Sequence, residues 1–183
     1  MKRLDQLLTG VAVSEWRGNR QAEVSATIFP LKNALTLQIL GERKLKGTES
    51  FRDSAVEVLV WHMYSAASNY SALPTTNLHQ TFCDCRNLRI LGMMNVENIS
   101  EFTDPFKGCA SLERIGLYHL DKNISLKDSP LLKKESIVSI LAESQPSTAI
   151  TITLHPDAYA RLKDDTEIVA ALEAQPLISL VSA

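Results

Sequence analysis

The sequence predicts an α/β solenoid with about six short parallel strands, in which helices become more regular toward the C-terminus. Three observations support this fold class. Two segments of the chain match each other at one constant offset, further short runs have the composition of strands, and helical patterns fill the last intervals between those runs. Because one unit cannot bury its own strand face, a repeat of this kind predicts units that stack on one another.

The length and charge of the chain limit the classes of protein to which it can belong. Its 183 residues suffice for one domain. With 19 basic and 21 acidic residues, it offers no electrostatic reason to bind nucleic acid or an anionic membrane. No stretch approaches the roughly 18 consecutive apolar residues that a membrane helix needs. We therefore expect a globular chain without membrane insertion and without a nucleic-acid partner.

The first residues predict a cap. Residues 1–10 form an amphipathic pattern that is typical of a short helix, and residues 24–29 have the composition of a strand. We expect residues 1–32 to cover the open end of the stack and residues 33–183 to form the solenoid, within one compact domain. Charged residues interrupt every apolar run in residues 1–20, so no signal peptide is predicted. The expected cellular compartment depends on whether Met1 is the true start of the protein. We expect the cytoplasm or a virion if it is, and the cell surface if the chain is a fragment.

The repeat is clearest in residues 82–93 (FCDCRNLRILGM) and 106–117 (FKGCASLERIGL). Phe82 aligns with Phe106 and Cys85 with Cys109, and the same offset relates every other matched pair. Five apolar or cysteine positions and one glycine match in this way. Weaker strand-like runs of apolar and β-branched residues cover residues 35–40, 51–61, 149–154 and 177–181. These six runs are the predicted strands.

Helical patterns lie in the C-terminal part of the chain. Pro130 precedes a run in which apolar residues recur every three or four positions as far as Leu141. The same spacing recurs in residues 156–162 and 166–172, and Pro176 ends it. These three patterns predict helices between the last strands.

Residues 82–117 resemble the leucine-rich repeats of the BspA-like, treponemal type, whose unit runs approximately F-x-x-C-x-x-L-x-x-I-x-L. The resemblance extends more weakly from residue 51 to residue 183. It implies one strand per unit in a parallel sheet, with the phenylalanine and cysteine in the interior. It also implies a non-enzymatic binding or adhesion scaffold, of a kind common on bacterial surfaces.

Outward positions of the predicted strands form a candidate partner-binding face. Because side chains alternate along a strand, Arg114, Gly116 and Tyr118 are expected to face outward beside Ile90. Trp61 joins this face if Val58 and Val60 point inward, and it lies in the core otherwise. The full set of candidate residues is Trp61, Ile90, Arg114, Tyr118, Thr151 and Thr153. A row of tryptophan, tyrosine and arginine over small residues is typical of a recognition surface.

The cysteines have three interpretations. Cys83, Cys85, Cys109 and His79 include the donor atoms of a zinc site, although Cys-x-Cys is not the usual spacing. A disulfide between Cys85 and Cys109 is sterically reachable if successive units stack at strand spacing. The repeat itself explains both residues as small buried side chains, which is the interpretation we favour. No metal or cofactor is predicted.

Three function classes follow. The first is a non-enzymatic module that binds a protein or glycan partner through its strand face. The second is a structural or assembly component, such as a phage, virion or cell-surface part, that makes contacts through the ends of its stack. The third is an enzyme, but no positioned nucleophile, base and orienting group can be named, so no catalytic residue is predicted.

The last nine residues predict an exposed edge. Residues 175–183 carry no charged side chain, and their strand would form the last of the stack. Such an edge is normally blunted by lysine, proline or a cap, and only Pro176 is present here. We therefore expect self-association or docking through this C-terminal segment.

Overall fold

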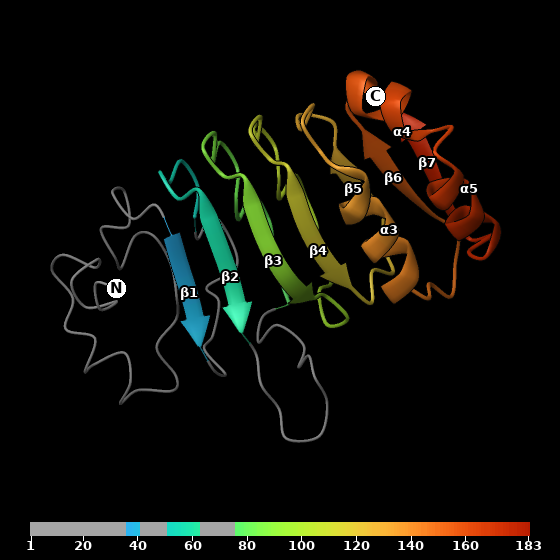
Figure 1. Ribbon diagram of the computed structural model, residues 1–183. Helices are drawn as coiled ribbons and strands as arrows, with labels where there is room; N and C mark the ends of the chain where they lie inside the picture. Colours follow the sequence, from blue (N-terminus) through green and yellow to red (C-terminus); the bar gives the residue numbers. More distant parts are fainter. Residues whose placement is uncertain (1–35, 41–50, 63–75) are drawn as a thin grey trace, which may run out of the picture.

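The computed structural model describes residues 36–40, 51–62 and 76–183, and within them the chain forms two parallel sheets and three helices (Figure 1). The four-stranded sheet runs in the order β1 (Thr36–Leu40), β2 (Val58–His62), β3 (Ile90–Asn95) and β4 (Arg114–Tyr118). The three-stranded sheet runs in the order β5 (Ile124–Leu126), β6 (Ile150–Leu154) and β7 (Ile178–Ser182). The helices are α3 (Lys134–Glu143), α4 (Pro156–Leu162) and α5 (Thr166–Glu173).

The predicted leucine-rich repeat solenoid with about six parallel strands is wrong. The described residues contain seven strands, and these divide into separate sheets of four and three. Each of the six predicted runs overlaps a strand, and four of these strands extend one or two residues beyond the predicted end. The strand β5 is not predicted, because three residues are too few to show an alternating pattern. The predicted cap, residues 1–32, lies outside the described residues.

The four-stranded sheet ends at β4 because α3 takes the position beside that strand (Figure 1). The Ser136 hydroxyl accepts a hydrogen bond from the backbone N–H of Ile115 at 3.0 Å. At the other end of the helix, the carbonyl of Glu143 accepts from the N–H of His119 at 3.0 Å. A helix therefore satisfies edge groups that another strand would otherwise bond, and covering an edge in this way prevents further pairing.

A column of aromatic rings runs through the core of the repeated units. The ring centroids of Phe51 and Phe82 are 5.6 Å apart, and those of Phe82 and Phe106 are also 5.6 Å apart. The second pair is nearly parallel, with an interplanar angle of 2°. All three rings are buried, and Leu126 is the buried apolar residue of the next unit. The prediction that Phe82 and Phe106 stack inside the protein is confirmed.

Small polar side chains form a second column beside the rings. The thiol of Cys85 donates to the carbonyl of Phe51 at 2.8 Å, and the thiol of Cys109 donates to the carbonyl of Phe82 at 3.1 Å. In the following unit, the Ser129 hydroxyl donates to the carbonyl of Cys109 at 3.1 Å. Each of these carbonyls also accepts a backbone N–H within its own unit, so the side chain adds a second hydrogen bond that links one unit to the next.

Backbone hydrogen bonds also connect successive units of the repeat. The N–H of Asp84 donates to the carbonyl of Lys107 at 2.7 Å, and the N–H of Asp53 donates to that of Cys83 at 2.9 Å. Asp53, Asp84 and Gly108 have left-handed φ angles of 54°, 58° and 74°. At Gly108 a Cβ atom would lie 2.6 Å from the Asp84 carboxylate, so only glycine fits without movement of that side chain.

Two short helices connect β6 to β7, and they match the predicted ranges. The imidazole of His155 accepts from the N–H of Asp157 at the start of α4, and the Asp165 carboxylate accepts from the N–H of Glu167 at the start of α5. Leu162 and Ile168 are buried against the core. No helix in the described ranges is long and apolar enough to cross a membrane.

Replacing Cys109 tests the column of small polar side chains. In Cys109→Ala the carbonyl of Phe82 loses its thiol donor and keeps only the backbone N–H of Cys85, whereas Cys109→Ser retains a hydroxyl of the kind that Ser129 supplies in the next unit. We expect the alanine variant to be less stable than the serine variant by about 0.5–1.5 kcal/mol, the net contribution of one hydrogen bond. Denaturant midpoints of the two variants measure the difference, and an alanine variant at least as stable as the serine variant would contradict it.

Replacing Ser136 tests how α3 ends the four-stranded sheet. Ser136→Ala removes the acceptor for the buried N–H of Ile115, so we expect a loss of about 1–3 kcal/mol in the free energy of unfolding. Ser139, on the same helix and only partly buried, provides the matched control. Ser139→Ala should change stability by less than about 0.5 kcal/mol. Equal effects of the two substitutions in thermal unfolding would show that this hydrogen bond is unimportant.

Candidate interaction surface

Three residues form a row on the outward face of the four-stranded sheet. Val58 pairs with Ile90 across β2 and β3, and Ile90 pairs with Arg114 across β3 and β4. Val58 and Ile90 are partly exposed and Arg114 is exposed, whereas the next residue in each strand is buried. We call Val58, Ile90 and Arg114 the β2–β4 row. The structure brings the predicted residues Ile90 and Arg114 together, and it adds Val58, which points inward in only one of the two registers that the sequence left open.

Tyr118 does not belong to this surface. It was predicted to face outward, but it is only 8% exposed. The alternation of β4 is otherwise as predicted, with Ile115 and Leu117 buried. The neighbouring strand β3 is irregular here: Leu91 pairs with Ile115, but Leu117 pairs with Met94 and not with Met93, its match in the repeat. Tyr118 lies opposite Asn95, and both residues are buried.

Trp61 is placed only in part. Its backbone belongs to β2 and pairs with Ile39, but its side chain lies outside the described part of the structure. The register on which its predicted exposure depended is not the observed one, because Leu59 is fully buried and Val58 is partly exposed.

Thr151 and Thr153 lie on the other sheet. Both are partly exposed at alternate positions of β6, between the buried Ile150, Ile152 and Leu154. The hydroxyl of Thr151 is 3.2 Å from that of Ser179 on β7, so hydroxyl groups line this face. Because the two sheets are separate, these residues do not extend the β2–β4 row.

A ladder of alternating charges borders the β2–β4 row. Arg89, Glu113 and Lys133 occupy equivalent positions in successive units, since the N–H of each donates to the carbonyl of the one before. The Glu113 carboxylate accepts from Arg89 Nε at 2.9 Å and from Lys133 Nζ at 2.7 Å. Hydrogen bonds from Lys133 and Arg89 lower the pKa of Glu113 from 4.5 to about 2. The sequence does not show this ladder by itself, although residues of opposite charge stand just before β3, β4 and α3.

Arg114 differs from these neighbours. Arg89 and Lys133 are both held by Glu113, whereas Arg114 makes no ion pair with any other residue that the structure describes. Its guanidinium lies at the end of the β2–β4 row, beside the partly exposed Ile90. The arrangement can offer bidentate hydrogen bonds to a carboxylate next to an apolar contact.

The cysteines are buried and free, so the predicted option of a Cys85–Cys109 disulfide is not realised. Burial raises the pKa of the Cys85 and Cys109 thiols, which keeps them protonated as donors. His79 lies 3.4 Å from Glu101 instead of joining the cysteines. Among the described residues, no group of three or more His, Cys, Asp or Glu side chains is arranged to hold a metal ion.

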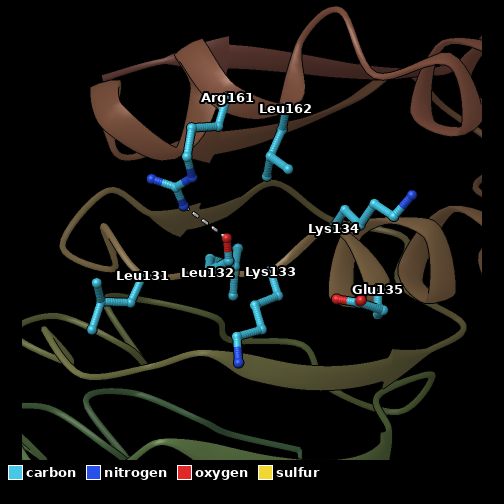
Figure 2. A pocket seen from close by; sticks show the side chains of 7 residues that line it. All are labelled: Leu131, Leu132, Lys133, Lys134, Glu135, Arg161 and Leu162. Atoms are coloured by element: carbon cyan, nitrogen blue, oxygen red, sulfur yellow. Dashed lines mark hydrogen bonds between the residues drawn. The ribbon is translucent and has the colours of Figure 1, made fainter.

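A shallow cavity of about 490 Å³ lies between α4 and the segment before α3. Figure 2 shows that Arg161 crosses it to the carbonyl of Leu132, and the same guanidinium also donates to the carbonyl of Pro130. Arg161 therefore fastens α4 to the neighbouring loop. None of the predicted binding residues lines this cavity.

The pKa of Glu113 makes stability depend on pH. Because the folded pKa is depressed, the carboxylate stabilises the fold above about pH 4.5, and this contribution is lost as the pH falls toward 2. We expect Glu113→Gln to lower the melting temperature at neutral pH, and the difference from wild type to shrink over that window. Glu97→Gln, at an exposed position without an ion pair among the described residues, is the control. A difference that stays constant with pH would refute this role of Glu113.

Comparisons with known proteins find no relative. No family model, no curated protein and no solved structure matches the chain.

Proposed function

We propose that the chain is a non-enzymatic protein-interaction module, and that its β2–β4 row binds an acidic segment of a protein partner. Arg114 supplies the charged contact and Ile90 and Val58 supply apolar surface beside it. The single observation that carries the proposal is the exposed Arg114 guanidinium, which makes no ion pair within the described residues while the two neighbouring cations share one carboxylate.

The chemistry of the row favours a carboxylate-bearing protein segment. Arginine recognises carboxylates through two parallel hydrogen bonds, and it is enriched among the residues that contribute most to binding at interfaces. The aliphatic surface next to Arg114 favours a partner that also presents an apolar side chain. An uncharged glycan has no carboxylate for Arg114, so we place a glycan partner second.

Two further observations support a binding role over a catalytic one. The Cys85 and Cys109 thiols are buried and hydrogen bonded to carbonyls, and burial raises the pKa of each, so neither is a nucleophile at neutral pH. The resemblance of residues 82–117 to BspA-like repeats supports the same function class, because that family is associated with binding and adhesion.

A second candidate function is that of an assembly component. The observation that favours it is the position of β7 at the edge of its sheet, where Leu177 and Val181 are 41% and 37% exposed. Such an edge can join one molecule to another without using the β2–β4 row.

Charge reversal at Arg114 tests the binding role. Immobilised wild type, Arg114→Glu and Arg86→Glu would be incubated with extract and washed, and the captured proteins quantified by mass spectrometry. Arg86 is an exposed arginine on a turn outside the row, so it matches the change in charge. We expect a partner that wild type and Arg86→Glu recover equally, and that Arg114→Glu recovers at least about tenfold less.

A peptide from the captured partner completes the test. Its acidic segment should compete with the intact partner, and replacing its carboxylates with amides should abolish the competition. Equal recovery by all three immobilised proteins would contradict the assignment of the β2–β4 row as the binding site.

A further inference from the structure

The open side of β7 is defined by its hydrogen bonds to β6. The N–H of Ile150 donates to the carbonyl of Leu177 at 2.8 Å, and the N–H of Ala183 donates to the carbonyl of Leu154 at 2.9 Å. In a parallel pair, the backbone groups of successive residues point alternately to the two sides of a strand. Ser179 and Val181 therefore bond toward β6, and Leu180 and Ser182 point their backbone groups away from it.

This outward side of β7 has no strand beside it in the described part of the chain. It presents the N–H and carbonyl of both Leu180 and Ser182 and the carbonyl of Ile178, while the N–H of Ile178 bonds to Gln175. We call these groups the β7 edge. Unpaired strand groups of this kind are a template for another strand.

The side chains of the β7 edge lack the features that normally prevent pairing. Residues 175–183 contain no charged side chain, and the pairing of β7 with β6 is continuous along the strand without a bulge. Leu180 continues the row of Ile124 and Ile152, both buried, but is itself only partly buried. A further strand would therefore cover an apolar side chain as well as satisfy backbone groups.

We propose that the β7 edge pairs with the β7 edge of a second copy of this chain, antiparallel, with Leu180 opposite Leu180 of the other copy. The two Leu180 residues then exchange their N–H and carbonyl groups, and each Ser182 N–H donates to the Ile178 carbonyl of the other molecule. The two three-stranded sheets become one continuous sheet. This inference is independent of the binding role of Arg114.

A second copy fits this edge better than an unrelated peptide. A two-fold interface requires a patch that is complementary to itself. An uncharged edge meets no like charge in its own copy, and Leu180 meets an apolar side chain of the same size. The symmetric register also places both groups of Leu180, the N–H of Ser182 and the carbonyl of Ile178 opposite a matching donor or acceptor, and it leaves the carbonyl of Ser182 at the end of the strand to solvent.

Light scattering coupled to size-exclusion chromatography of the full chain tests the pairing. We expect wild type to be dimeric at about 100 μM and to dissociate on dilution. Ser182→Pro removes an outward N–H and blocks the edge, while proline is tolerated at such edge positions, so this variant should be monomeric. Thr153→Lys adds a charge to the face of the adjacent strand β6 and should remain dimeric.

Cysteine crosslinking tests the register. Leu180→Cys should form an intermolecular disulfide under mild oxidation, because directly opposite residues have Cα atoms about 5.5 Å apart. Val181→Cys should not, because its counterpart is displaced along the strand beyond the reach of a disulfide. The three native cysteines are buried, so they do not compete.

Three results would overturn the proposal: monomeric wild type at the highest concentration, a Ser182→Pro variant as dimeric as wild type, or crosslinking of Val181→Cys but not of Leu180→Cys. Arg114→Glu should leave the dimer unchanged. Loss of partner capture and loss of dimerisation are therefore separate outcomes.

Discussion

Hydrogen bonding between successive turns of the chain is the interaction on which the rest of this structure depends. Backbone hydrogen bonds from Asp53 and Asp84 link each of their units to the next, and the N–H of Gly108 bonds to the carboxylate of Asp128. The stacked units bring the rings of Phe51, Phe82 and Phe106 together with centroids 5.6 Å apart. In the neighbouring column, thiols and a hydroxyl add a second hydrogen bond to carbonyls that already accept a backbone N–H. The aromatic and polar columns are therefore two consequences of one geometry, in which burial and hydrogen bonding reinforce each other.

Helix α3 decides where that pattern changes. By bonding to Ile115 of β4 through Ser136 and to His119, directly after β4, through Glu143, it covers the edge of the four-stranded sheet. The strand β5, which precedes the helix in the chain, belongs to the second sheet with β6 and β7. The two sheets differ in what lies beside their last strands, β4 and β7. The edge of β4 is covered by a helix, whereas the outward side of β7 is open within the described residues. The molecule consequently has two distinct places for contacts, the β2–β4 row on one sheet and the β7 edge on the other.

The two surfaces have different chemistry. Beside the β2–β4 row, Arg89 and Lys133 share the Glu113 carboxylate, whereas Arg114 has no ion pair within the described residues and is the cation available to a partner. Charge complementarity of this kind contributes more to the choice of partner than to affinity. The β7 edge has no charged side chain, and its specificity comes from main-chain hydrogen bonds and register. One surface suits an acidic partner of different sequence, and the other suits an identical strand.

Local patterns in the sequence determined the strands that show a clear alternation, the three helices and the burial of Phe82, Phe106, Cys85 and Cys109, because periodicity and residue size act over a few neighbours. They also indicated that Ile90 and Arg114 share a face. The division into two sheets could not be predicted, since it depends on which distant strands pair, and β5 is too short to carry a pattern. The burial of Tyr118 and the pairing of Glu113 with both Arg89 and Lys133 were also decided by the tertiary structure. The shared ion pair requires units distant in sequence to be stacked in register. Such effects arise from pairing between segments, which no single segment contains.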